Sequence, residues 1–157
     1  MIRAGDEQSP ARSGQVDETE AKALQTVLAA AHAAVYAYAL IGAKGQGGTR
    51  RRAVERLDRL TERRDRLAGR VSNSGRRPDP PAAGYALPFE VRSETSLRAL
   101  ARQVEQALAA ADADLVAGAA PGRRLEAADW LAEDSVAAAA WGSDDEPFPG
   151  LPERSTR

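Results

Sequence analysis

The stretch that most restricts the fold is a long, proline-rich link, SNSGRRPDPPAAGYALPFEVR, at residues 72–92. A connection of this length without regular structure is uncommon inside a small domain. On both sides of it, apolar residues recur at alternating steps of three and four, which is the period of an amphipathic helix. The link therefore separates two helical halves, and it is long enough to carry the chain from one end of a domain to the other.

Four segments have the helical period, and they predict helices at residues 17–41, 50–71, 93–116 and 123–141. Ser93 is the predicted N-cap of the third helix, because its hydroxyl can accept from a free backbone N–H. The glycine-rich stretches at 42–49 and 117–122 are predicted to end the first and third helices. The expected inward faces are Leu24, Leu28, Ala31, Val35, Tyr38 and Gly42; Ala53, Leu57, Leu60, Leu67 and Val71; Leu97, Leu100, Val104, Leu108, Ala111 and Leu115; and Leu125, Ala128, Ala132, Val136 and Ala139.

The turns within each half are short, so each half is predicted to be an antiparallel helical hairpin. The long link lets the third helix run parallel to the second, which predicts an all-α, ferritin-like four-helix bundle with one long crossover between helices two and three. The apolar side chains in the link predict that it packs along the outside of the bundle; they are Tyr85, Leu87, Phe89 and Val91. The bundle is expected over residues 17–142, with a disordered tail at 1–16 and an extended tail at 143–157.

Composition excludes several classes of chemistry. The chain has 157 residues and no cysteine, which excludes disulfides, thiolate catalysis and cysteine-ligated metal. Its net charge of −1 provides no general attraction to nucleic acid or to a membrane surface. We find no secretory signal and no run of about 18 apolar residues. A cytoplasmic protein without a membrane segment is therefore expected.

The most charged segment, TRRRAVERLDRLTERRDRLAGR at residues 49–70, allows two interpretations. It could be a basic helix that binds nucleic acid, or a solvated helix face whose charges pair within the helix. Glu55–Arg59 and Glu62–Arg66 have the favourable i, i+4 order for such pairs. The segment also has no aromatic residue on which bases could stack. We therefore favour a solvated, self-paired face and predict no nucleic-acid partner.

Several strings resemble one known family when taken together in this order: AHAAVYAYALIGA, RRDRL, AGYALPFEV, VEQALAAADADLVA and AAAAWGSDDEPFPGLP. They are similar to an uncharacterised ferritin-like domain of unknown function from GC-rich actinobacteria. The resemblance covers most of residues 20–152. It implies a glutamate at the position of Ala31 and, in many members, a histidine at the position of Leu60. Glu105 matches a glutamate that the family usually keeps.

A ferritin-like di-iron centre needs about four carboxylates and two imidazoles that converge in the bundle. His32 is the only histidine in this chain, and Ala29 stands where a Glu-x-x-His motif would need glutamate. We therefore predict no di-iron centre, no cofactor and no catalytic residue. The residual metal-ligand candidates are His32, Glu105 and Asp112, of which the last two share a helix face. The favoured alternative is that His32 lies at the edge of the core and is hydrogen-bonded to a carboxylate such as Glu105.

The remaining aromatic and alanine residues predict packing more than chemistry. Tyr38 is expected in the bundle with its hydroxyl hydrogen-bonded, and Tyr36 nearer the surface. Trp130 and Trp141 are expected to pack within the fold, or one of them in a subunit interface. Alanine on all four inward faces permits either close helix packing or an apolar cavity, and the sequence leaves both open.

These observations favour a non-enzymatic helical scaffold or interaction module. A homodimer through helices one and two is expected, because narrow alanine-rich faces suit packing against a copy of the same chain. One alternative is a residual metal-binding protein or oxidase that uses His32 and Glu105. A second alternative is a carrier of a small apolar molecule in the bundle interior.

Overall fold

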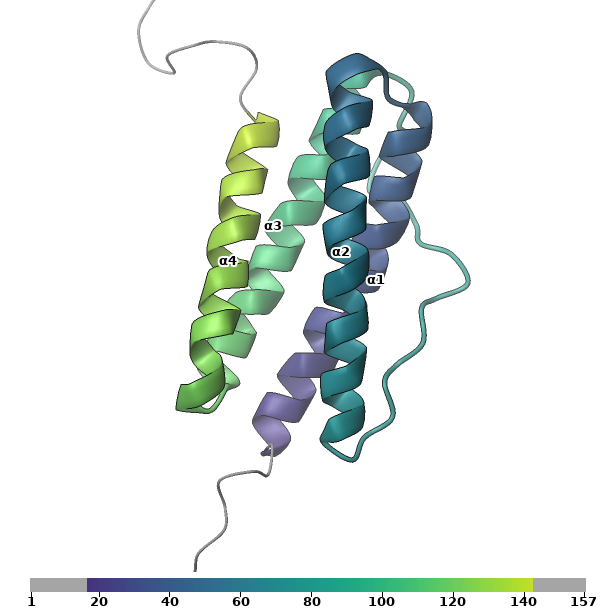
Figure 1. Cartoon of the computed structure of the whole chain (residues 1–157). Helices are drawn as coiled ribbons and strands as arrows, with labels where there is room; N and C mark the ends of the chain where they lie inside the picture. The colour runs from purple at the N-terminus through teal and green to yellow at the C-terminus, as the bar shows by residue number, and fades with distance from the viewer. Residues whose placement is uncertain (1–16, 143–157) are drawn as a thin grey trace, which may run out of the picture.

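The computed structural model describes residues 17–142, and this part of the chain forms four α-helices and no β-strand. The helices are α1 (Glu18–Lys44), α2 (Gly47–Asn73), α3 (Glu94–Gly118) and α4 (Pro121–Gly142). They lie side by side as a bundle (Figure 1). The two predicted tails, 1–16 and 143–157, fall outside the described residues.

The chain order of the bundle confirms the predicted topology with one long crossover. α1 and α2 form one antiparallel hairpin, and α3 and α4 form the other (Figure 1). Residues 74–93, called the strap below, return the chain to the end at which α2 begins, so α3 runs parallel to α2. α1 packs against both α2 and α3, whereas α4 packs mainly against α3.

The strap packs against the bundle through part of its apolar surface. Val91 is buried, and the ring of Tyr85 lies 5.3 Å from the ring of Tyr36 on α1. Leu87 and Phe89 are each 37% exposed. The predicted packing of this link along the outside of the bundle is therefore confirmed for two of its four apolar residues.

Local side-chain hydrogen bonds explain where α1 and α3 begin. The Asp17 carboxylate accepts a 2.8 Å hydrogen bond from the backbone N–H of Glu20. Ser93 is the N-cap of α3, as predicted, and forms a reciprocal capping box with Ser96. These bonds satisfy backbone donors that the first turn of a helix leaves without partners.

The glycine-rich turn between α1 and α2 is shorter than predicted. α1 continues to Lys44 and α2 begins at Gly47, so the prediction that residues 42–49 interrupt the helices was wrong for most of this stretch. Packing between the two helices outweighs the weak helix propensity of glycine. Gly45 is required at the turn, because a Cβ atom there would lie 2.7 Å from the carbonyl oxygen of Ile41.

The core has two apolar clusters, one toward each end of the bundle. The first includes Leu28, Leu67 and Trp130, and the second includes Leu60, Leu108 and Trp141. Both tryptophans are buried within the chain, which agrees with their predicted packing role. Polar and charged side chains are buried in the bundle as well, and they are described in the next section.

The inward face of α4 is the largest error of the sequence prediction. Leu125 and Val136, predicted to face the core, are 74% and 69% exposed. The buried residues of α4 are instead Ala127, Trp130, Asp134, Ala138 and Trp141. The prediction was based on the aliphatic side chains of α4. Its orientation is instead determined by the burial of the Trp130 and Trp141 rings and of the Asp134 carboxylate.

α1 is long and apolar enough, by length and composition alone, to cross a membrane, with a mean hydropathy of 1.6 over its best window. A core helix or an N-terminal signal sequence passes the same test. In the bundle, α1 buries a continuous stripe that includes Leu24, Leu28 and Ile41 against α2 and α3. Of the most apolar window of α1, 39% is buried in the bundle, so the core accounts for part of its hydropathy.

Candidate functional site

The candidate site begins with two arginines of α2 that point into the bundle. Arg56 and Arg63 are buried, so the prediction that the charges of this segment form a solvated face was wrong for these two residues. They lie seven residues apart, which places them on the same side of the helix. Both guanidinium groups reach carboxylates on α3 and α4, where they form the network described next.

Arg56 joins three helices through one guanidinium group. Its Nε and Nη2 atoms each donate a 2.8 Å hydrogen bond to the two carboxylate oxygens of Glu105 on α3. Nη1 donates to Glu133 at 2.5 Å, and Nη2 also donates to Asp134 at 2.5 Å, both on α4. Burial alone would lower the pKa of Arg56, but its hydrogen bonds and charge pairs with these carboxylates raise the pKa above the ordinary value.

Arg63 forms the second junction of the network. Its Nη1 donates to both oxygens of Asp134, at 2.8 and 3.1 Å, and its Nη2 donates to Oδ1 of Asp112 on α3. The guanidinium carbon lies 4.6 Å from the centre of the Trp130 ring, a cation–π arrangement. Asp134 therefore receives hydrogen bonds from both buried arginines and links the two halves of the network.

Tyr38 connects α1 to the network, as its predicted place in the bundle suggested. Its hydroxyl donates a 2.5 Å hydrogen bond to Oε1 of Glu105. Burial and the neighbouring charge of Glu105 raise the pKa of the Tyr38 hydroxyl well above its ordinary value. Tyr38 therefore stays protonated and acts as a hydrogen-bond donor at physiological pH.

Asp112 has a raised pKa, which favours the protonated carboxyl group at neutral pH. Burial raises the pKa of its carboxyl group to about 8, and a hydrogen bond to Asp134 adds to this shift, against the attraction of Arg63. Oδ2 of Asp112 is buried and has no hydrogen-bond partner among the described residues. A proton on Oδ2 would let this atom act as a donor toward the neighbouring Asp134 carboxylate. It also leaves two buried positive charges, on Arg56 and Arg63, opposite two buried carboxylates.

His32 lies outside this network. Its Nε2 is 3.1 Å from the backbone oxygen of Asp79 in the strap, and the backbone N–H of Asp79 in turn donates to the side chain of Gln25. A carbonyl oxygen only accepts, so Nε2 carries the proton and donates this hydrogen bond. The predicted hydrogen bond between His32 and Glu105 was therefore wrong, since Glu105 is occupied by Tyr38 and Arg56.

The residues of the bundle interior do not fit a di-iron centre. Ala31 and Leu60 point inward and are fully buried, so the positions that the family resemblance assigned to ligands hold hydrocarbon. Glu105 and Asp112 do share the inward face of α3, but each binds a guanidinium group. Within residues 17–142, no group of three or more acidic or histidine side chains is placed to hold a metal ion.

What the network can do chemically is hold the helices in register. Removing one member would leave a buried charge without its partner, which costs about 3–5 kcal/mol for an ion pair. The network also spans the side of the bundle where α2 faces α4, a pair of helices with few backbone contacts. Long arginine side chains therefore bridge a gap that close helix packing does not fill.

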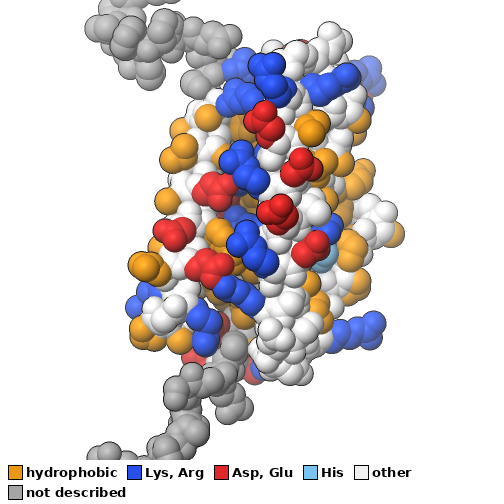
Figure 2. Space-filling view, in the orientation of Figure 1, with side chains coloured by type: hydrophobic (Ala, Val, Ile, Leu, Met, Phe, Trp, Pro, Cys, Tyr) orange, Lys and Arg blue, Asp and Glu red, His pale blue; other side chains and the backbone are white. Residues whose placement is uncertain are grey.

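The outer surface of α2 has mixed charge, but the predicted pairs Glu55–Arg59 and Glu62–Arg66 are not among the ion pairs of residues 17–142. Figure 2 shows Lys and Arg side chains interspersed with Asp and Glu on the face that α2 presents to the viewer. Two arginines of this side also contact α4, since Arg52 lies 4.4 Å over the Trp141 ring and Arg70 forms an ion pair with Glu126.

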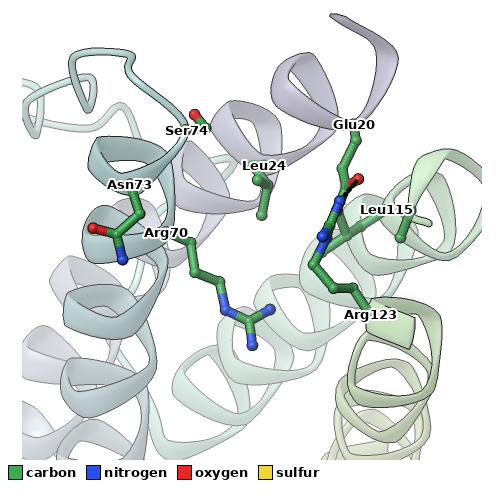
Figure 3. Close-up of a pocket in the computed structure, with 8 residues that line it drawn as sticks. Glu20, Leu24, Arg70, Asn73, Ser74, Leu115 and Arg123 are labelled. Atoms are coloured by element: carbon green, nitrogen blue, oxygen red, sulfur yellow. Dashed lines mark hydrogen bonds and ion pairs between the residues drawn. The ribbon is translucent and has the colours of Figure 1, made fainter. Parts of the chain in front are cut away.

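A cavity of about 240 Å³ opens at the end of the bundle where α1 and α4 begin and α2 and α3 end (Figure 3). The alanine-rich sequence had left open whether the bundle contains a cavity. This cavity lies at one end, and its lining is mixed rather than apolar: it includes Leu24 and Leu115 as well as Glu20, Arg70 and Arg123.

Three buried members of the network were not predicted from the sequence: Arg56, Arg63 and Asp134. A signal for them exists in the heptad spacing. Arg56 and Arg63 are seven residues apart and alternate with the inward residues Ala53, Leu60 and Leu67, which have the same spacing. Asp134 likewise lies midway between Ala127 and Trp141 on α4. Charged residues in register with an apolar heptad face the core, where they need partners of opposite charge.

Comparisons with other proteins give a family but no activity. Residues 23–153 match the family described as a domain of unknown function (DUF4439). Among solved structures, the chain is similar to a conserved hypothetical protein, Rv2844, from Mycobacterium tuberculosis, with 30% sequence identity and a TM-score of 0.75. That match covers 79% of this chain and 88% of the other. No curated protein matches the sequence.

Proposed function

This chain belongs to the DUF4439 family. From the ion pairs inside its helical bundle, we propose that it acts as a non-enzymatic helical scaffold or interaction module. The observation that carries the proposal is the pairing of Glu105, Asp112 and Asp134 with the guanidinium groups of Arg56 and Arg63. In a ferritin-like enzyme, inward carboxylates bind metal ions. Here the same kind of residue stabilises the contacts between helices.

The chemistry of arginine supports this interpretation. A guanidinium group stays protonated in proteins, so Arg56 and Arg63 keep two positive charges among the carboxylates at any physiological pH. A divalent cation would have to displace both groups and bury them elsewhere. His32 could supply only one imidazole, and it lies against the strap rather than beside Glu105.

The direct test is the metal content and redox activity of the purified chain. Protein made without a histidine tag, from cells supplied with iron, manganese and zinc, is analysed by mass spectrometry of the elements and by Fe(II) oxidation under air. We expect far less than one metal ion per chain and no oxidation above the buffer rate. One or two tightly bound transition-metal ions per chain would overturn the proposal. If that metal were lost on His32→Gln or Glu105→Gln, a residual metal site would be established.

The assembly expected for such a module is a homodimer through α1 and α2. The strap covers part of the outer side of α1, so a second copy would meet the seam between the two helices near Val54, which is 46% exposed. Multi-angle light scattering over a range of concentrations measures the mass. We expect a dimer that Val54→Arg dissociates and that Leu125→Arg, on the exposed side of α4, leaves intact. A monomer at all concentrations, or dissociation by the α4 variant alone, would refute this interface.

A further inference from the structure

The cavity at the end of the bundle contains an arginine with unused hydrogen-bonding capacity. Arg70, on the last turns of α2, is held by its ion pair with Glu126 and lies 5.3 Å from the Trp130 ring. Only its Nη2 atom donates to a protein acceptor within residues 17–142. A guanidinium group has five N–H donors in a planar arrangement. Most of the donors of Arg70 are therefore free to bind a ligand in the cavity.

The cavity also contains a second charged pair, Glu20 and Arg123, which bind each other. Arg123 donates to both oxygens of Glu20, at 2.5 and 2.6 Å, and the backbone N–H of Ala120 adds a hydrogen bond to the same carboxylate. These hydrogen bonds, chiefly that from Arg123, lower the pKa of Glu20, so it stays ionised. Figure 3 shows this pair on the side of the cavity opposite Arg70. Arg123 directs two of its nitrogen atoms at Glu20 and Arg70 directs only one at Glu126, so an incoming anion would find more free donors at Arg70.

The floor of the cavity is apolar. Leu24, Leu115 and Ala119 line it, and all three belong to one of the core clusters. At its mouth lies Asn73, an exposed residue at the end of α2. The volume of about 240 Å³ is far more than one water molecule needs, so the cavity can admit a small organic molecule. A ligand of that size would have one polar end and a short hydrocarbon part.

We propose that this cavity binds a small amphipathic monocarboxylate, such as a short-chain fatty acid. The carboxylate accepts hydrogen bonds from the free donors of Arg70, in the planar geometry that arginine offers to carboxylates. The hydrocarbon chain lies against Leu24 and Leu115, where its burial is favourable. This binding site is separate from the ionic network and does not depend on the scaffold role proposed above.

The test uses hexanoate, which has eight non-hydrogen atoms, as the probe and isothermal titration with the full chain. 1-Hexanol and hexylammonium have the same number of carbon atoms as hexanoate but no carboxylate, and inorganic phosphate supplies an anion without the hydrocarbon. We expect hexanoate to bind in the micromolar to millimolar range and to bind at least about tenfold more tightly than either analogue, since a charge-assisted hydrogen bond contributes about 1.5–3 kcal/mol. Phosphate should not displace it at equal concentration.

Two variants locate the site. Arg70→Gln should weaken hexanoate binding about tenfold or more and leave hexanol binding unchanged, whereas Arg66→Gln, at an exposed arginine one turn earlier on α2, should change neither. Asn73→Trp, at the exposed mouth, should block hexanoate without disturbing the core. The proposal fails if hexanoate does not bind below 10 mM (roughly 2.7 kcal/mol of binding free energy). It also fails if Arg70→Gln binds hexanoate as tightly as the wild type, or if phosphate displaces hexanoate completely.

Discussion

The buried proton on Asp112 leads to a sharp prediction about stability and pH. Asparagine has nearly the same shape as a protonated aspartic acid, and its amide can still donate to Asp134 and accept from Arg63. It cannot ionise. Asp112→Asn should therefore reproduce the network as it exists below pH 8 and keep it at higher pH, where the wild type must bury an additional negative charge.

The size of the effect follows from the pKa of Asp112, which is about 8 in the folded protein against an ordinary value of 3.8. Because the folded-state pKa is raised, the favourable contribution of this group is complete below about pH 4 and is lost as the pH rises toward 8. The free energy of unfolding should fall by up to about 1.4 kcal/mol per pH unit in this window. Between pH 5 and 7.5 the difference between variant and wild type should therefore grow by about 3 kcal/mol in favour of the variant.

The assay is urea unfolding of both proteins at a series of pH values from 5 to 8.5, followed by circular dichroism. With a slope of about 2 kcal/mol per molar urea, the predicted change shifts the difference in midpoints by about 1.5 M. Asp114→Asn, at an exposed position of the same helix, is the matched control and should leave the pH dependence unchanged. If Asp112→Asn is destabilised equally at every pH, Asp112 is ionised in the folded protein and the argument is wrong.

Three further substitutions test other parts of the structure by the same unfolding assay. Tyr38→Phe removes the hydrogen bond to Glu105 from a fully buried site, and should cost about 1–2 kcal/mol with helix content unchanged; no measurable loss would mean that this bond does not stabilise the network. Gly45→Ala should destabilise by more than about 1 kcal/mol, because its Cβ would overlap a carbonyl oxygen, while Gly48→Ala meets open space and should be neutral or slightly stabilising; equal effects would count against the described turn. Val136→Asn should change stability by less than about 0.5 kcal/mol, and a loss of 2 kcal/mol or more would restore the predicted orientation of α4.

Of the two aspartates in the network, Asp112 could be identified from the sequence and Asp134 could not. Asp112 was identified through its spacing from Glu105, because residues seven apart share a helix face whatever the rest of the fold does. Asp134 was missed, because α4 also has an aliphatic stripe on its opposite side, and periodicity alone does not say which of two stripes faces the core. Two buried tryptophans decide this, since a large ring gains more from burial than several alanine methyl groups.

The amino-acid sequence by itself determined the number of helices, the long crossover and the absence of paired histidines, because helical period, proline-rich composition and residue identity are local properties. Only the tertiary structure decided which side chains meet: Arg56 and Arg63 reach carboxylates that lie about fifty residues or more away along the chain. Local sequence alone does not determine whether a charged residue of a helix faces solvent or a buried partner of opposite charge. The partner, supplied by another helix, determines which of the two occurs.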